Sequence, residues 1–478
     1  MSAVLKNHGA GIYDELERLA KAMTTVAEFG LQDALKKGAD EVQISANASF
    51  RKRLVVENKE FSLANSLQTQ NISIVLHKEH KKGSASVNSA EATSLAKAAE
   101  DALALASFSK ADTSLAFAKA TAAPRNTQLK FLYDGDLAEM DLAELQEGMT
   151  EVLAELSKDK RVALDRFEMG INVSYHTLLN SHGVHQVETQ TMVNWDFLGM
   201  AVDGGEVSGM DYDGGFAFAK KGYLTAAVQE AAAFVKKVVK NLNPTRCNSY
   251  KGAIILSPRA VEEILIPTVL YHSSGRSVMD GKSRWQNALG TKVAAPLLTI
   301  VDDPHNARFS GATSFDGDGI PTRQNLIFDK GVLRMHLHDC YSARRLKVES
   351  TATSGGPFGL QVSGGHNTLQ DLAGQQKELL YVDRFSGNCD PVTGSFSGVA
   401  KSIDRFRIGF LDDFCQYCAC FSFGFAGDDE GVDADFHAVI VGCCFGADIV
   451  DLCPDTFDRA ALGEIPVRHT RGHIARGA

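Results

Sequence analysis

The histidine side chains are the groups in this 478-residue chain best suited to bind a metal ion. His336 and His338 are two positions apart in a segment predicted to be the outgoing strand of a hairpin, so both imidazoles point to the same side. Asp339, Cys340 and His305 are available as further ligands, and a metal site is therefore conceivable. The alternative, which we favour, places two histidines on the solvent face of an edge strand.

Other motifs predict turns and structural side chains. Asp316-x-Asp318-Gly319 begins like a calcium loop but lacks the later acidic ligand, which predicts a turn. A nucleophile elbow is excluded because Phe396 stands where the serine would be. Arg344 could bind a peptide carboxylate, although a buried or solvated structural arginine is the interpretation we favour.

Two glycine-rich tracts, Ser354–Gly365 and Asp383–Lys401, offer main-chain groups instead of side chains. Small side chains between turns allow an extended peptide to add as a strand, through backbone hydrogen bonds that do not depend on its sequence. The alternative is a turn-rich connector between strands. Besides Arg344, the candidate substrate-binding residues are Gly355, Gly356, Gly364 and Gly365.

The composition limits the class of protein. A net charge of -10 and a pI near 5.8 argue against nucleic-acid binding, which needs clustered lysine and arginine. No run approaches the about eighteen apolar residues of a membrane span, and the charged N-terminal segment lacks the apolar core of a signal peptide. Nine cysteines without regular pairing indicate reduced thiols. We therefore expect a soluble, cytoplasmic protein with no membrane partner.

The elements that must position these groups predict an α+β protein: an α/β unit over residues 1–120, a middle α+β unit over 125–245, and a β-rich unit over 250–401. The predicted helices are Tyr13–Met23, Leu31–Lys37, one from an Asn88 cap to about Ala106, Asp141–Leu156, Leu224–Leu242 and one from Pro258. The predicted strands include Asp40–Ser45, Arg53–Val56, Asn71–Leu76, Lys82–Val87, Phe167–Tyr175, Thr191–Phe197, Gly252–Leu256 and the hairpin Leu326–Phe328/Val332–Arg334.

Several tracts, in order over roughly residues 30–401, resemble the PmbA (TldE) branch of the TldD/PmbA family of peptidase-related proteins. The tracts are Lys82–Asp101, Asn180–Gly183, Leu298–Leu346, Ser354–Gly365 and Asp383–Lys401. The resemblance implies an N-terminal α/β domain and a β-rich C-terminal domain. It also implies a two-subunit assembly in which the TldD-type partner is a zinc metallopeptidase acting on peptides and unfolded segments.

The TldD branch carries a helical His-Glu-x-x-x-His motif, in which zinc lowers the pKa of bound water toward about 7 and the glutamate accepts the proton. No His-Glu pair occurs in this sequence. In the corresponding span, Pro267 replaces the first ligand, Thr268 replaces the general base, and only His272 remains. One imidazole does not hold a catalytic zinc. We expect no catalytic residue and no cofactor in this chain, zinc in the partner subunit, and His272 at a surface or an interface.

The composition changes from Ser402 onward. Residues 402–478 contain no lysine, eleven aspartates against two glutamates, nine phenylalanines and six of the nine cysteines. Loss of the reading frame in a GC-rich gene produces such a switch, a hypothesis that sequencing across codon 402 tests. The alternative is a metal-binding appendix, although the cysteine spacing matches no regular zinc or iron–sulfur pattern. The motif cysteines are Cys415, Cys418, Cys420, Cys443, Cys444 and Cys453.

The leading prediction is a non-catalytic, TldE-like subunit that joins a TldD-type zinc peptidase and helps bind peptide or unfolded substrates. The first alternative is a self-contained, metal-dependent peptidase, acting as a homodimer, with a metal site built from His272, His336 and His338. The second alternative is a Cys-rich metal-binding protein that uses the tail.

Overall fold

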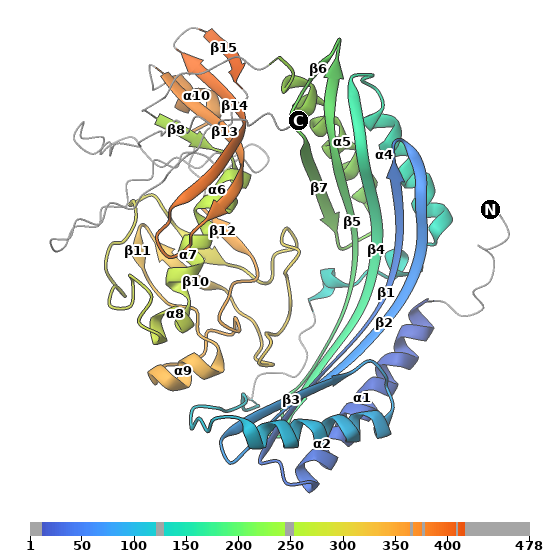
Figure 1. Cartoon of the computed structure of the whole chain (residues 1–478), viewed down its shortest axis with the longest axis vertical. Helices are drawn as coiled ribbons and strands as arrows, with labels where there is room; N and C mark the ends of the chain where they lie inside the picture. The colour runs from blue at the N-terminus through green and yellow to red at the C-terminus, as the bar shows by residue number, and fades with distance from the viewer. Residues whose placement is uncertain are drawn as a thin grey trace, which may run out of the picture.

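The computed structural model of the chain describes residues 12–120, 129–243, 253–363, 367–374, 378–407 and 410–415. These residues form two domains (Figure 1). Residues up to 243 build a long, curved sheet with helices on one face, and residues from 253 onward build a domain of short strands and helices opposite the other face. The predicted α+β class is confirmed. Within these ranges, no helix combines the length and the hydropathy needed to cross a bilayer.

The large sheet has seven strands in the order β3-β2-β1-β4-β5-β6, with β7 also paired to β5. Every pairing in it is antiparallel. The strands are β1 (Glu41–Glu57), β2 (Glu60–Lys78), β3 (Lys81–Val87), β4 (Val162–Asn180), β5 (His185–Asp203), β6 (Glu206–Val207) and β7 (Asp211–Ala217).

One hydrophobic core joins the two segments that the sequence predicted as separate units. β1, from the first segment, pairs with β4, from the second, along the register Gln43↔Asn180 to Glu57↔Arg166. Buried side chains of both segments belong to the same cluster. The predicted boundary near residue 120 therefore falls inside one sheet and one core.

Helices cover one face of the large sheet because their apolar side chains repeat at helical spacing. In α4, for example, Leu145, Met149 and Val152 are fully buried, and Asp141 caps the helix by accepting a hydrogen bond from the Glu144 amide. The helices of this domain are α1 (Ile12–Lys36), α2 (Ala92–Phe108), the 3-10 helix η1 (Lys130–Leu132), α3 (Gly135–Glu139), α4 (Leu142–Leu156) and α5 (Tyr223–Lys240).

Some predicted boundaries in this domain are wrong. The two helices expected before residue 38 are the single helix α1, which ends just before Gly38 as predicted. The first residue of α2 is Ala92, with Glu91 rather than Asn88 in the cap position and no side-chain cap. Packing of the helix faces on the sheet, and not local capping, therefore decides where these helices begin and end.

The second domain contains two sheets of four strands, in the orders β11-β10-β9-β12 and β15-β14-β13-β8. The predicted hairpin near residue 330 is confirmed as β10 and β11, with Phe328 opposite Leu333. The elements are β8 (Ala253–Leu256), α6 (Pro258–Ile264), α7 (Ile266–Ser273), α8 (Gly275–Met279), β9 (Ile300–Asp302), β10 (Asn325–Asp329), β11 (Val332–Leu333), α9 (Cys340–Leu346), β12 (Leu360–Val362), α10 (Leu369–Gly374), β13 (Glu378–Cys389), β14 (Phe396–Arg407) and β15 (Phe410–Cys415).

The tract Asp383–Lys401 is most of one β-hairpin, formed by β13 and β14, rather than a series of short strands between turns. β14 continues to Arg407, so the start of the tail predicted at residue 402 falls within a strand. Residues 416–478, which include all of the tail's motif cysteines after Cys415, lie outside the described residues.

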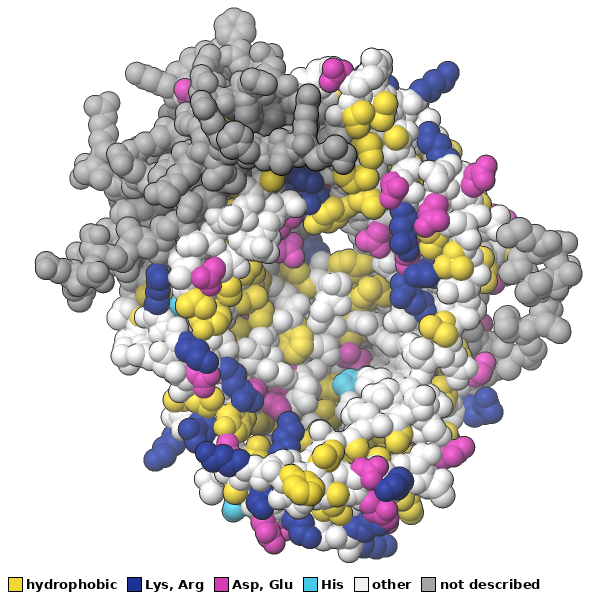
Figure 2. All heavy atoms as spheres, viewed as in Figure 1, with side chains coloured by type: hydrophobic (Ala, Val, Ile, Leu, Met, Phe, Trp, Pro, Cys, Tyr) yellow, Lys and Arg dark blue, Asp and Glu magenta, His cyan; other side chains and the backbone are white. Residues whose placement is uncertain are grey.

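Contacts between the two domains include one near each end of the large sheet. At one end of the large sheet, the Glu188 carboxylate accepts hydrogen bonds from the amide and the hydroxyl of Ser314, both at 2.6 Å. At the other end, Arg384 of β13 pairs with Asp211 of β7 at 2.9 Å. Figure 2 shows that the molecule is hollowed between the sheet and the second domain.

Gly83 lies where β3 crosses α2, and a Cβ added there would stand 1.9 Å from the main-chain oxygen of Ala102. We expect Gly83→Ala to lower the free energy of unfolding in urea by about 1–3 kcal/mol, because the helix must move away from the strand. The matched control is Gly135→Ala in α3, where a Cβ meets nothing within 4 Å. We expect a change below about 1 kcal/mol there, and equal losses for both variants would contradict the close approach.

Candidate functional site

Helices α6 and α7 carry the segment that the sequence predicted to correspond to the zinc-binding helix of the TldD branch. The Ser257 hydroxyl accepts a hydrogen bond from the Ala260 amide (3.1 Å), and Pro258 occupies the first turn, as the sequence predicted. The same hydroxyl donates to the main-chain oxygen of Asp383, which attaches α6 to β13. α7 follows almost directly, with Pro267 in its first turn.

His272 lies in the last turn of α7 and is 2% exposed. Its Nδ1 accepts a hydrogen bond from the Arg284 amide (3.2 Å), and its Nε2 donates to the main-chain oxygen of Val392, between β13 and β14 (3.1 Å). The ring is therefore neutral and protonated on Nε2, and burial, which lowers the pKa of His272, favours the same form. The expected surface position of this histidine is wrong, because its ring joins three segments of the second domain.

A catalytic zinc needs about three protein ligands, each with an unshared lone pair. Pro267 has no ligand atom, and both ring nitrogens of His272 are engaged with main-chain groups. Thr268 is 1% exposed, and its hydroxyl lies beside the half-buried Cys389 thiol, whose pKa is raised by partial burial. The residues at the motif positions do not fit a zinc ion.

His336 and His338 are buried, at 3% and 7% exposed, so their predicted place on the solvent face of an edge strand is wrong. β11 ends at Leu333, before either of them. His336 Nε2 donates to the main-chain oxygen of Trp285 (3.0 Å), and His338 Nδ1 lies 3.4 Å from the Ser342 hydroxyl. The ring centroids are 6.2 Å apart and the rings nearly perpendicular. Burial lowers the pKa of both imidazoles, which hold structural positions in the domain core.

The other proposed metal ligands have separate contacts. His305 Nε2 is 3.0 Å from the Thr322 hydroxyl, and the Asp339 carboxylate accepts from the Arg276 guanidinium at 2.5 Å. Burial raises the pKa of the Cys340 thiol, which disfavours the thiolate that a metal would need. Over the described ranges, no group of three or more His, Cys, Asp or Glu side chains is arranged to hold a metal ion.

Asp316 organises the turn that the sequence predicted in place of a calcium loop. Its carboxylate accepts hydrogen bonds from the amides of Asp318 (3.0 Å), Ile320 (2.8 Å) and Ser354 (3.0 Å). Burial, and to a lesser extent the charge of Asp318, raises the pKa of Asp316 to about 6. The bond from Ser354 attaches the first glycine-rich tract to this turn.

The candidate peptide-binding residues belong to other segments than α7. Gly355 has a φ of +86°, and the Gly356 amide donates to the main-chain oxygen of Thr353 (3.0 Å), so both belong to a turn. Arg344 is exposed in the last turn of α9, with Nη1 3.5 Å from the Leu115 main-chain oxygen. Gly364 and Gly365 lie outside the described residues. Peptide binding by these residues stays a prediction.

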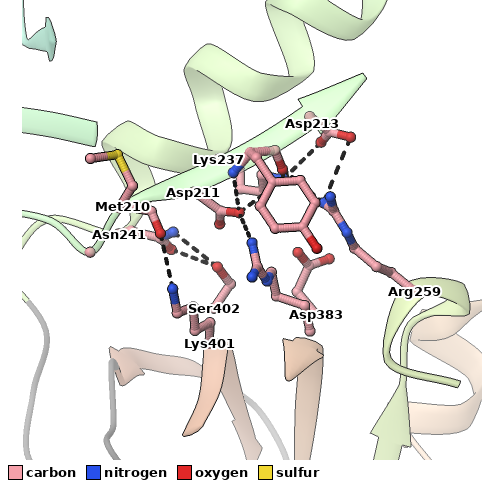
Figure 3. Close-up of polar contacts among 12 residues, drawn as sticks. Met210, Asp211, Asp213, Lys237, Asn241, Arg259, Asp383, Lys401 and Ser402 are labelled. Atoms are coloured by element: carbon pink, nitrogen blue, oxygen red, sulfur yellow. Dashed lines mark hydrogen bonds and ion pairs between the residues drawn. The ribbon is translucent and has the colours of Figure 1, made fainter. Parts of the chain in front are cut away.

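A charge cluster at the contact between β7 and β13 was missed by sequence reasoning (Figure 3). Arg384 and Asp211 are 5% and 1% exposed, and Lys237 Nζ lies 3.6 Å from the same Asp211 oxygen. The guanidinium groups of Arg384 and Arg259 lie 4.0 and 4.2 Å from the centre of the Tyr212 ring. Cation–π contacts and the ion pair together hold β13 of the second domain against β7.

The same contact buries two more acids. Burial raises the pKa of Asp383 and of Glu263, whose carboxylate accepts a hydrogen bond from the Phe385 amide. Asn241 donates to the Ser402 hydroxyl at 2.9 Å, so the first residue of the predicted tail is also part of the contact. The sequence indicated this cluster only through Asp383 and Arg384, at the start of the tract Asp383–Lys401. The partner of Arg384, Asp211, lies 173 positions away in the chain.

The sheet face opposite the helices is polar. Three guanidinium groups, of Arg51, Arg53 and Arg166, surround the Glu168 carboxylate at 3.0, 3.5 and 2.7 Å. Amide and hydroxyl groups there offer hydrogen-bond donors and acceptors to a main chain laid against the sheet. The uncharged polar residues of this face include Ser45, Asn47, Ser49, Asn172, Ser174, Gln190 and Asn194.

Known families and proteins match this chain over much of its length. The family described as PmbA/TldA metallopeptidase C-terminal domain matches residues 249–409, a little beyond residue 401, where we expected the resemblance to end. A metalloprotease PmbA homolog of Haemophilus influenzae is 26% identical over 396 residues, which cover 80% of this chain and 84% of the relative. The metalloprotease PmbA of Escherichia coli O157:H7 is 24% identical, over 72% of this chain and 74% of its own length.

The fold also matches a solved structure. The crystal structure of TldE from Thermococcus kodakarensis superimposes with a TM-score of 0.73 and 21% sequence identity, covering 84% of this chain and 91% of that one. The two-domain arrangement described above is therefore shared with that protein.

The pKa of Asp316 makes stability depend on pH in a defined direction. Since the folded-state pKa is raised from 3.8 to about 6, the contribution of this carboxyl group is present below pH 3.8 and is lost as the pH rises through about 6. We expect the stability of the wild type relative to Asp316→Asn to fall by about 2–3 kcal/mol between pH 4 and pH 7. Urea unfolding of both proteins at each pH measures this difference, and parallel pH profiles would contradict it.

Removal of the buried cation tests the contact at Asp211. We expect Arg384→Met to lower the free energy of unfolding by about 3–5 kcal/mol, because it leaves a buried carboxylate with the more distant Lys237 as its nearest cation. Arg334→Met removes a similar ion pair with Asp329 (2.7 Å) whose side chains are 47% and 34% exposed, and we expect a loss below about 1 kcal/mol. Equal losses in chemical denaturation would show that burial of Arg384 contributes nothing.

Proposed function

This chain belongs to the PmbA branch of the TldD/PmbA family, and we propose that it is a non-catalytic subunit that assists a TldD-type zinc peptidase. Its relatives are named as metalloproteases, so the family chemistry is metal-dependent peptide hydrolysis. In the proposed complex the partner supplies the zinc, the ligands and the general base. This chain supplies surface for the substrate.

The observation that carries the proposal is the state of His272. The single histidine at the motif positions donates from Nε2 to Val392 and accepts at Nδ1 from Arg284. To bind a metal, the ring would have to give up at least one of these bonds and leave its buried position. The neighbouring positions, Pro267 and Thr268, replace the first ligand and the general base of the motif.

The proposed substrate is an extended peptide or an unfolded segment. Support comes from the polar sheet face, which borders the hollow seen in Figure 2. Amides and hydroxyls such as those of Asn172, Ser174 and Gln190 can pair with any peptide backbone, whatever its side chains. Such a surface suits a peptidase that accepts many sequences.

The proposal places the complex in the cytoplasm. The two cysteines whose side chains are described, Cys340 and Cys389, are free thiols, as a reducing compartment favours.

Co-expression with a TldD-type partner tests the proposal. We expect this chain alone to purify with far less than one zinc per molecule and to cleave no peptide. Added to the partner, it should raise the rate of peptide hydrolysis, and a chelator should abolish that rate. Zinc analysis and a fluorogenic peptide assay measure both effects.

His272→Ala provides the control within this chain. Because His272 is structural in the proposal, the variant should lower thermal stability without changing the zinc content of the complex. Chelator-sensitive cleavage by the isolated wild-type chain, lost in His272→Ala, would overturn the proposal.

A further inference from the structure

Three arginine side chains surround one carboxylate on the polar face of the large sheet. Arg51 and Arg53 come from β1, and Arg166 comes from β4, which pairs with β1 in the middle of the sheet (Figure 1). Their guanidinium groups lie 3.0, 3.5 and 2.7 Å from the Glu168 carboxylate. A structural ion pair needs one cation, and like charges this close together repel each other. The cluster therefore holds more positive charge than Glu168 neutralises.

The neighbouring charges leave this excess in place. Asp196 of β5, opposite Glu168 in the register, is a second acid within electrostatic reach of Arg51 and Arg166. Even with both carboxyl groups ionised, three positive charges stand against two negative ones. Burial raises the pKa of Asp196, which enlarges the excess. Because the chain as a whole carries a net charge of -10, this positive cluster is not part of a generally basic surface.

The guanidinium groups remain open to a second anion. Within the described residues, Arg51 and Arg166 each donate one hydrogen bond to Glu168, through Nη2, and Arg53 comes no closer to it than 3.5 Å. Each guanidinium has five N–H donors, so most of them are left for a ligand or for water. The arginine side chains are 46%, 26% and 43% exposed, against 13% for Glu168. The acid is enclosed while the cations are accessible, an arrangement suited to binding an anion from the hollow.

We propose that Arg51, Arg53 and Arg166 bind a carboxylate group of the substrate peptide. The inference rests on the proposed function, in which an extended peptide lies on this sheet face. Ser174 lies six positions beyond Glu168 on the same face of β4. Six strand residues span about 20 Å, so a peptide of about six residues laid along β4 from Ser174 reaches the arginines with its end. The carboxylate belongs either to the C-terminus of the peptide or to an acidic side chain near it.

The test measures peptide binding by the full-length chain alone. Fluorescence anisotropy gives the dissociation constants of three peptides of about eight residues, each with an uncharged dye at the N-terminus. The first is neutral and ends in an amide, the second is neutral except for a free C-terminal carboxylate, and the third ends in an amide but carries one glutamate. We expect at least one carboxylate peptide to bind about tenfold more tightly than the neutral peptide at about 50 mM salt, and less so at about 500 mM. Preference for the second peptide identifies a chain end as the ligand, and preference for the third identifies an acidic side chain.

Substitutions within the cluster have expected effects of opposite sign. Arg51→Gln and Arg166→Gln should each lower the preference for a carboxylate at least about threefold, because each removes a cation that contacts the ligand. Glu168→Gln should raise it at least about threefold, because it removes the carboxylate that competes for the same donors. Arg161→Gln is the matched control: its side chain is 43% exposed, as is that of Arg166, but it pairs with Asp159 outside the cluster, and the preference should not change.

The inference is overturned if the wild type binds the three peptides equally or binds none of them. Insensitivity to both cluster arginine variants, weaker carboxylate binding by Glu168→Gln, or an equal loss in Arg161→Gln would also overturn it. Circular dichroism checks that each variant is folded, and if Glu168→Gln is not, the two arginine variants decide. The proposed function fails separately, if this chain does not stimulate hydrolysis of the neutral peptide by the TldD-type partner.

Discussion

The hydrogen bonds of the His272 imidazole constrain what this chain can do. One ring nitrogen holds the Arg284 amide and the other holds the main-chain oxygen of Val392, so the ring ties α7 to the turn of the β13–β14 hairpin. In a zinc peptidase the same kind of side chain must keep a lone pair free for the metal. In this chain, the lone pair on His272 Nδ1 accepts the hydrogen bond from the Arg284 amide. The helix α7 therefore has a structural role in the second domain, through the contacts of its histidine.

Two contacts, one near each end of the large sheet, hold the two domains on either side of a hollow. The Arg384–Asp211 pair fixes one end, and the turn organised by Asp316, with Ser314 bound to Glu188, fixes the other. Both contacts bury charged groups, which is costly unless each group keeps good partners. These contacts join the two domains on either side of the hollow. A polar hollow is consistent with a subunit that offers a surface to substrates.

Sequence patterns predicted the elements better than the site. Amphipathic spacing located α4 and α5, and the turn residues near Lys330 located the hairpin, because these signals are local. The long pairing of β1 with β4 could not be predicted, since it joins segments more than a hundred positions apart and merges two expected units. The burial of His272 and His338 was missed for the same reason: a histidine bonded to a distant main-chain group looks, in sequence, like one at the surface. For the Arg384–Asp211 pair, the sequence indicated only the tract that contains Arg384, because its partner lies 173 positions away.

Location of zinc in an assembled complex tests the central claim most directly. Crystals of this chain with a TldD-type partner, measured at the zinc absorption edge, would show each zinc as an anomalous peak. The account predicts a peak in the partner subunit, and none within bonding distance of His272. A peak at His272, with its ring turned away from Val392 and Arg284, would contradict it.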